Sequence, residues 1–294
     1  MISSGTDVSD SAALFCLREA GSRLNPSPML AIEAPYRQIF SALGLNSFDS
    51  VVAHFAGEHR PPKTTVVVKP ALISAPGLSP IPVFYKQYEY VPAAWEFIFR
   101  PSKATREFQN YAAFLRVGIP CAERIACGEL RDATGRLRRA FIITRAIPDA
   151  VNLIDFVKRH CPNRVTEHSR ELRDALCGRL AELTRSAHSA SFFHRDLVWR
   201  NILVTRQPLA RPHLWWIDCP RGSFLRWTPW RRRHRLKDLA SLDKTAAKLC
   251  TRAERVAFVR QYLGLKRLDP SAKRLIRDVL KYREQRWPED WNER

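Results

Sequence analysis

The residues best suited to chemistry stand together at His194–Asn201, between a long stretch of helical periodicity and two short apolar runs. A carboxylate such as Asp196 can orient an acceptor hydroxyl and take up its proton. The amide oxygen of Asn201, five residues later, can bind a divalent cation. The alternative is that both side chains only form turns before a strand.

A second carboxylate, Asp218, directly follows the apolar run Trp215–Ile217, which with Ile202–Val204 predicts a short hairpin. In this position a carboxylate can hold a Mg²⁺ ion that bridges nucleotide phosphates. The alternative is an aspartate that simply begins the turn before Pro220.

Upstream, Lys86 ends a short apolar run that begins at Ile81, and Glu107 lies one turn into a helix predicted from Ser102 to Val117. A strand lysine held by a helix glutamate can contact the α- and β-phosphates of a nucleotide. Lys103 is a rival partner for Glu107, although that pair would more simply be a surface contact one helical turn apart.

The order of these elements is that of protein-kinase-like enzymes, and residues 194–201 match their catalytic-loop pattern H-R-D-L-x-x-x-N without an insertion. We therefore predict an α+β, two-lobed fold. Its N-lobe would hold an antiparallel sheet with one long helix, and its C-lobe would be mostly helical. The predicted units are an N-terminal helical extension (1–50), an N-lobe (51–148) and a C-lobe with C-terminal helices (149–294).

Within these units, apolar periodicity and turn residues predict the individual elements. Strands are expected at 51–55, 64–69, 81–88, 123–130 and 139–145, with a turn at 132–135. Helices are expected at 153–158, at 167–188 and from about residue 236 onward.

From Phe84 to about Leu263, the sequence resembles the bacterial lipopolysaccharide kinases, protein-kinase-like enzymes that phosphorylate heptose or Kdo sugars of the lipopolysaccharide inner core. The residues that carry this resemblance are Ala104–Phe108, Leu115, Gly118–Pro120, Gly128–Glu129, His194–Leu197, Asn201–Leu203, Trp216–Asp218, Arg235–Leu242 and Phe258–Leu263.

The resemblance implies a kinase that transfers the γ-phosphate of ATP, with Mg²⁺, to a sugar hydroxyl of the lipopolysaccharide core. It implies an ion pair of Lys86 with Glu107, Asp196 as the base, and Asn201 and Asp218 as Mg²⁺ ligands. His194 is then a support of the catalytic loop rather than the base, and Asp238 can anchor that loop from the next helix.

Two features depart from the kinase pattern. Asp218-Cys219-Pro220 replaces D-F-G, which keeps the carboxylate and argues against a switching loop. No glycine-rich loop precedes Lys86, so other groups must cover the phosphates, with Gly57 and Lys63 as candidates. A pseudokinase that only binds its partners is therefore a competing hypothesis, as is a kinase acting on a protein or on another small molecule.

The chain carries 49 Lys and Arg against 29 Asp and Glu, a net charge of +20, which points to an anionic partner. Part of this excess lies where an activation segment is expected, interleaved with Trp227 and Trp230; the arginines are Arg221, Arg231, Arg232, Arg233 and Arg235. Such a segment suits an anionic glycolipid or the surface of the inner membrane. The alternatives are a solvated basic run and nucleic-acid binding, which would depend on charge alone, so no specific nucleic acid is expected.

Other features narrow the class of protein. The 11 glycines never lie within five residues of one another, which excludes a Rossmann fingerprint and a Walker A loop. The seven scattered cysteines form no C-x-x-C pair, which favours reduced thiols and a cytosol-like compartment. No export signal or membrane span is indicated. We expect a cytoplasmic protein on the inner face of the inner membrane.

Overall fold

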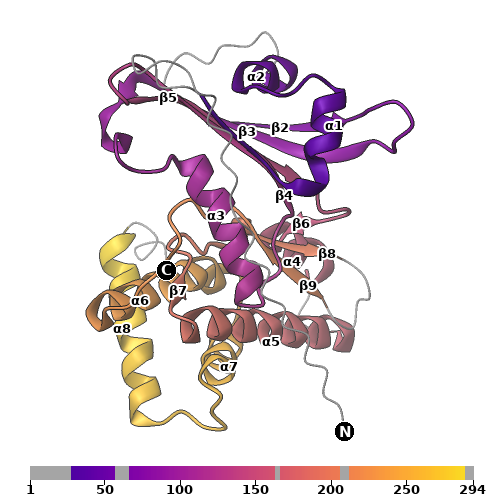
Figure 1. Ribbon diagram of the computed structural model, residues 1–294. Helices are drawn as coiled ribbons and strands as arrows, with labels where there is room; N and C mark the ends of the chain where they lie inside the picture. The colour runs from indigo at the N-terminus through magenta and orange to yellow at the C-terminus, as the bar shows by residue number, and fades with distance from the viewer. Residues whose placement is uncertain (1–27, 57–65, 163–165, 206–211, 289–294) are drawn as a thin grey trace, which may run out of the picture.

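The computed structural model describes residues 28–56, 66–162, 166–205 and 212–288. Within these ranges a sheet with its covering helices forms one lobe, and the remaining helices form the other (Figure 1). Leu14 and Leu17 of the predicted N-terminal extension lie outside the described residues, as do Gly57 and Lys63.

A five-stranded antiparallel sheet in the order β1-β4-β5-β3-β2 builds the N-terminal lobe. Its strands are β1 (Met29–Ile32), β2 (Val66–Ile73), β3 (Ile81–Ala94), β4 (Arg124–Arg131) and β5 (Leu137–Arg145). The central strand β5 is buried on both faces, because Phe141 and Ile143 join one hydrophobic cluster while Ala140 and Ile142 join another. The sheet therefore needs a cover on each side.

One face is covered by α1 (Arg37–Ala42), which follows the 3₁₀ turn η1 (Ala34–Tyr36), and by α2 (Phe48–Ala56). The approach is close at Gly128, where an added Cβ would lie 2.6 Å from the Phe141 ring and 2.9 Å from the Phe48 ring. Only glycine leaves room for α2 to pack against β4 here.

The strand predicted at residues 51–55 is wrong, because these residues belong to α2. Phe48, Val51, Val52 and Phe55 fall at positions i, i+3, i+4 and i+7, and all four are buried, as on one face of a helix. The boundary predicted at residue 50 thus falls inside a helix. Since β1 pairs with β4, the described part of the expected extension also belongs to the sheet layer.

The opposite face is covered by α3 (Lys103–Arg116), which follows the 3₁₀ turn η2 (Trp95–Phe97) and agrees with the helix predicted from Ser102. The side chain of Ser102 accepts a hydrogen bond from the Thr105 amide, as expected of an N-cap. Buried Glu129 of β4 accepts hydrogen bonds of 2.6 Å from the Ser102 amide and from Thr105 Oγ1. Although burial opposes it, this hydrogen bonding lowers the pKa of Glu129. The start of α3 is therefore fixed to the sheet.

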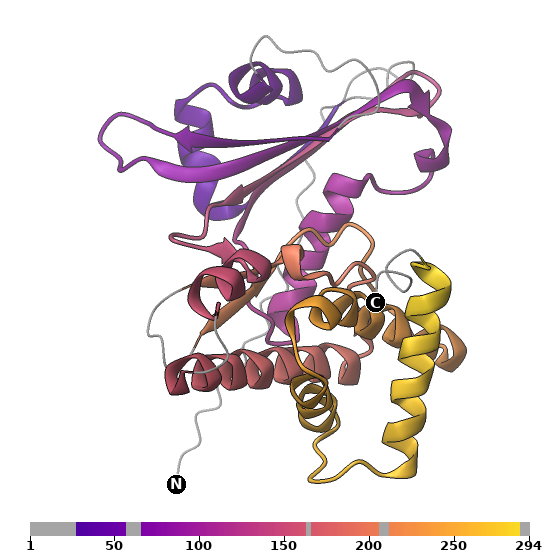
Figure 2. The same cartoon turned by 180° about the vertical axis from the view of Figure 1, so that it is seen from behind.

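The end of α3 enters the second lobe, as seen from behind in Figure 2. The ring of fully buried Phe114 lies 5.2 Å from the ring of Phe192 and 5.8 Å from that of Trp216, measured between centroids. One hydrophobic core thus runs from the sheet through α3 into the helical lobe.

The second lobe contains the remaining elements: β6 (Val151–Asn152), α4 (Leu153–His160), α5 (Glu167–Ser189), β7 (Phe192–Phe193), η3 (Trp199–Asn201), β8 (Ile202–Thr205), β9 (His213–Trp216), β10 (Ser223–Phe224), α6 (Thr228–Leu249), α7 (Arg252–Leu263) and α8 (Pro270–Arg286). The predicted hairpin is present as β8 and β9, joined by β6. Helix α6 begins at Thr228, earlier than the predicted start near residue 236, so most of the basic run is helical. Among the described residues, no helix is both long and apolar enough to cross a bilayer.

Because Phe114 joins the two lobes, we expect Phe114→Ala to lower the free energy of unfolding by about 3–5 kcal/mol. Urea denaturation followed by tryptophan fluorescence measures this loss. The matched control is Leu115→Ala, since Leu115 is the next residue of α3 and is 64% exposed. An equal loss in both variants would contradict the role given to Phe114.

Candidate active site

Three residues far apart in the sequence meet at the junction of the lobes. Lys86 Nζ of β3 lies 2.9 Å from Glu107 Oε2 of α3 and 2.5 Å from Asp218 Oδ1, two residues beyond β9. Glu107 is buried, whereas the Asp218 side chain is 40% exposed. The rival pairing is absent: within the described ranges, Lys103 makes no ion pair with Glu107.

Two tyrosines that the sequence analysis missed hold Glu107 in place. Tyr88 donates a hydrogen bond of 3.2 Å to Glu107 Oε2, and Tyr111 donates one of 2.9 Å to Oε1. Tyr111 also accepts a hydrogen bond of 3.1 Å from the Asp218 amide. Burial, followed by the Glu107 carboxylate, raises the pKa of both phenols, so both keep the proton they donate.

The charge of Lys86 is set by two opposing effects. Burial alone would lower the pKa of this ammonium group, but the carboxylates of Glu107 and Asp218 outweigh it and raise the pKa above its usual value. Lys86 is thus a fixed cation, as contact with nucleotide phosphates requires.

A fully buried carboxylate accepts hydrogen bonds from the backbone of the predicted catalytic loop. Asp238 of α6 accepts hydrogen bonds from the backbone amides of His194 (2.9 Å) and Arg195 (2.7 Å). His188 Nε2 lies 3.3 Å from the same carboxylate. Asp238 therefore makes the contacts expected of an anchor.

His194 makes the contacts expected of a supporting residue. Its Nε2 atom hydrogen-bonds to the Ile217 carbonyl at 3.1 Å, and its ring lies against those of Phe114 and Trp216. Burial lowers the pKa of His194. Its ring thus ties the loop to the strand that leads into Asp218.

Asn201 and Asp218 carry the amide and carboxylate oxygens that Mg²⁺ prefers as ligands. The Asn201 amide donates a hydrogen bond of 3.0 Å to the Asp196 carbonyl, which leaves its oxygen available as a ligand. No group of three or more His, Cys, Asp or Glu residues forms a metal site in the described part of the chain. Mg²⁺ bound with a nucleotide does not require one, since the phosphates complete its shell around one or two protein ligands.

The backbone around Asp218 is unusual and firmly held. Asp218 has φ of 56°, in the left-handed region that aspartate tolerates better than most residues. Beyond it, Asn110 donates hydrogen bonds to the carbonyls of Cys219 (2.6 Å) and Gly222 (3.0 Å). A Cβ on Gly222 would lie 2.3 Å from Cys219 Sγ, so no side chain fits there. The segment that replaces D-F-G is packed in place.

Comparison with known proteins agrees with this geometry. The sequence profile of the lipopolysaccharide kinase (Kdo/WaaP) family matches residues 90–262, more than half of the chain. The chain belongs to this family. The resemblance seen in the sequence is therefore confirmed, and the protein is a phosphotransferase of the kinase class. Lys86 lies just before the matched range, so the structure alone connects it to the site.

A solved structure described as "WaaP in complex with acyl carrier protein" is similar to this lipopolysaccharide kinase with a TM-score of 0.63 and 21% identity. The likeness covers 89% of this chain and 99% of that chain. It confirms the predicted two-lobed, kinase-like α+β fold. No curated protein sequence matches the chain.

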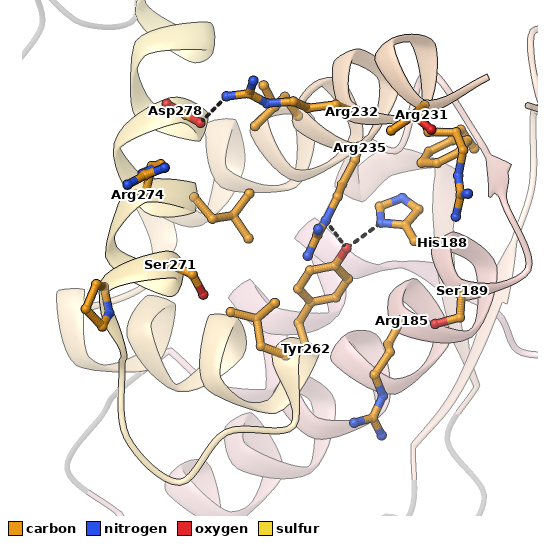
Figure 3. A pocket seen from close by; sticks show the side chains of 16 residues that line it. Arg185, His188, Ser189, Arg231, Arg232, Arg235, Tyr262, Ser271, Arg274 and Asp278 are labelled. Carbon is orange, nitrogen blue, oxygen red and sulfur yellow. Dashed lines mark hydrogen bonds and ion pairs between the residues drawn. The ribbon is translucent and has the colours of Figure 1, made fainter.

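The basic residues predicted to contact an anion do not form one site in this kinase. Arg231, Arg232 and Arg235 line a pocket on the helical lobe (Figure 3). Arg221 and Arg233 instead lie near Arg195, the residue before Asp196, and together with burial they lower the pKa of Arg195. Arg221 precedes α6, and the helical phase of α6 separates Arg233 from the three arginines that line the pocket.

Arg106, Arg195 and Lys237 are further cations near the catalytic loop that the sequence analysis missed. Burial, followed by neighbouring cations, lowers the pKa of Arg195 and of Lys237; Arg221 is one of those cations for both. Within the described ranges, none of these side chains has an ion pair. Positive charge therefore gathers beside Asp196. Arg195 lies in the His194–Asn201 motif and Lys237 directly precedes Asp238. Among 49 Lys and Arg residues, the sequence alone gave no reason to select either of them as a site residue.

We expect Glu107→Gln to raise the KM for ATP at least ~10-fold, about 1.4 kcal/mol of binding free energy. The substitution removes the buried charge that draws Lys86 toward α3 and leaves Asp218 as its ion-pair partner. Initial rates at varied ATP measure the effect. Glu171→Gln, on the exposed face of α5, is the control. A wild-type KM for Glu107→Gln would show that the ion pair does not position Lys86.

Proposed function

We propose that the protein transfers the γ-phosphate of ATP, in the presence of Mg²⁺, to a hydroxyl of a heptose or Kdo sugar in the lipopolysaccharide inner core. Family membership supports a kinase that acts on lipopolysaccharide. The observation that carries the finer proposal is the meeting of Lys86 with Glu107 and Asp218. These contacts support the proposal because, in the roles proposed for Lys86 and Asp218, they would bring a phosphate-binding cation next to a metal-binding carboxylate.

Each residue then has a distinct part in phosphoryl transfer. Lys86 holds the α- and β-phosphates, and Glu107 keeps the ammonium group in position. Asn201 and Asp218 would hold Mg²⁺, which supplies charge neutralisation on the phosphates when bound. Asp196 accepts the proton of the attacking hydroxyl.

The cations beside Asp196 favour an acceptor that is itself negatively charged. Besides burial, the nearby Arg221 cation lowers the pKa of both Arg195 and Lys237, and none of the three is neutralised by an ion pair in the described part of the chain. A carboxylate or phosphate near the accepting hydroxyl would relieve this repulsion. Kdo is a sugar acid whose carboxylate is such a group, which fits one of the two proposed acceptors.

We also propose contact with the cytoplasmic surface of the inner membrane. Phe224, Trp227 and Trp230 are 45–66% exposed at or just before the start of α6. Arg232 and Arg233 follow them and are also exposed. Aromatic and cationic side chains in one region suit the interface of an anionic bilayer.

Transfer of labelled phosphate tests the acceptor directly. Purified protein is incubated with γ-labelled ATP, Mg²⁺ and lipopolysaccharide from cells that lack the gene, and the labelled group is mapped. We expect label on a core sugar. Label on protein alone would replace the proposal with a protein kinase.

In that assay Asp196→Asn should reduce turnover at least ~10²-fold, because the side chain keeps its size and loses its basicity. ATP binding should remain near the wild-type value. Asp174→Asn, an exposed position on α5, serves as the control and should be fully active. Undiminished turnover by Asp196→Asn would remove this residue from the mechanism.

The pseudokinase hypothesis is tested by thermal unfolding with ATP. We expect ATP with Mg²⁺ to raise the Tm of the wild type above the value with ATP alone, because ligand binding stabilises the folded state. Asp218→Ala should abolish this Mg²⁺-dependent rise. A wild type that shows no rise would favour a pseudokinase.

A further inference from the structure

The connection between β3 and α3 exposes two large aromatic side chains. In this segment, residues 95–101 and here called the aromatic loop, Trp95 is 74% exposed and Phe99 is 98% exposed. Single apolar side chains are common on protein surfaces. Two aromatic side chains that lie four residues apart and make so little contact with the rest of the protein are not, and they indicate a surface that something else covers.

The backbone of the aromatic loop is firmly held, so this exposure is built into the fold. Between the two exposed side chains, Phe97 is buried, and its ring centroid lies 5.4 Å from that of Tyr90. The Arg131 guanidinium of β4 donates hydrogen bonds to the carbonyls of Phe97 (2.6 Å), Arg100 (2.9 Å) and Gly135 (3.2 Å). These contacts fix the loop to the sheet and to the turn between β4 and β5.

Positive charge surrounds the two aromatic side chains. Glu96 is an exposed carboxylate of the loop, and Asp132 of the neighbouring turn lies 3.8 Å from Arg138 in an ion pair. Three cations that have no ion pair within the described ranges lie in the loop or next to it: Arg100, Lys103 and Arg136. The surface is therefore aromatic at its centre and carries a net positive charge, in a chain whose own net charge is +20.

We propose that the aromatic loop inserts into the interface of an anionic phospholipid bilayer. Trp95 and Phe99 enter the boundary between headgroups and acyl chains, where aromatic side chains are favoured. Arg100, Lys103 and Arg136 then lie at the level of the headgroups and attract their phosphates. The loop forms an outer edge of the sheet lobe in Figure 1, and a bilayer can receive such an edge without a matching cavity.

This contact is additional to the one proposed at the start of α6, and it rests on the membrane location proposed there. The aromatic loop and α6 both lie toward the left in Figure 1 and toward the right in Figure 2. The loop belongs to the sheet lobe and α6 to the helical lobe. One contact from each lobe would fix the orientation of the junction between them relative to the bilayer.

The variant that tests the loop combines Trp95→Ser with Phe99→Ser. Its matched control combines Leu78→Ser with Leu115→Ser, two apolar residues outside the loop that are 57% and 64% exposed. A third variant, Trp227→Ser with Trp230→Ser, removes aromatic side chains from the contact proposed at the start of α6.

Circular dichroism and the Tm check that each variant is folded. If a double variant is not, the two corresponding single variants replace it.

Binding is measured by co-sedimentation with vesicles made of equal parts of phosphatidylethanolamine and phosphatidylglycerol. We expect the loop variant to raise the Kd at least ~10-fold, and the control variant to bind as the wild type does. The loss should persist at high salt, because salt screens the contribution of the cations and not that of the aromatic side chains. Vesicles of phosphatidylcholine alone should bind the wild type more weakly, because they carry no net negative charge.

The variants separate this proposal from the membrane contact proposed at α6. Wild-type affinity in the loop variant would overturn the inference, and a loss confined to the Trp227/Trp230 variant would leave only the contact at α6. A loss confined to the loop variant would support the inference and remove the contact at α6. A wild type that binds neither kind of vesicle would overturn both.

Insertion itself is measured by quenching of tryptophan fluorescence with lipids that carry bromine on their acyl chains. The chain has eight tryptophans, so the wild type is compared with Trp95→Phe, which keeps an aromatic side chain at this position. We expect stronger quenching in the wild type, because the difference between the two proteins reports Trp95. Equal quenching of both proteins, when both are fully bound, would show that Trp95 does not enter the bilayer and would overturn the proposal.

Discussion

A charged carboxylate cannot be buried without partners, because the loss of its hydration costs several kcal/mol. Glu107 is 3% exposed and meets this demand through Lys86, Tyr88 and Tyr111. Lys86 and Tyr88 come from the sheet, and Tyr111 extends the contact to Asp218 of the other lobe. One buried charge thereby requires the sheet, α3 and the Asp218 segment to adopt a single relative arrangement.

A second buried carboxylate has the same effect within the helical lobe. Asp238 receives two backbone amides of the catalytic loop and faces His188, so the loop conformation is fixed by α6 and α5. Arg195 has φ of 67°, an unfavourable backbone conformation that is held in part by the hydrogen bond from its backbone N–H to the Asp238 carboxylate. The two carboxylates position the loop and the strand lysine from opposite sides of the junction.

The contiguous parts of the site were predictable, because residues 194–201 have a fixed spacing and α3 carries its own capping signal at Ser102. Tyr88, Tyr111 and Asn110 were not, since their roles arise only from the packing of α3 against β3 and the Asp218 segment. Residues 51–55 alone are a short, mostly apolar run that is typical of a strand. The helical period becomes visible only when Phe48, which is buried together with Val51, Val52 and Phe55, is added to the pattern. The basic run was treated as one surface because its division depends on where α6 begins.

The fixing of the segment after Asp218 has a consequence for control. Protein kinases commonly control their activity by moving this segment. Here Asn110 donates hydrogen bonds to two carbonyls of the segment, and the surroundings of Gly222 are packed too closely to admit even a Cβ atom. The same segment continues into β10, which pairs with β7 directly before the catalytic loop. Because these contacts hold the segment in one conformation, we expect the rate of this kinase to depend on the concentrations of its substrates and not on a conformational switch in this segment.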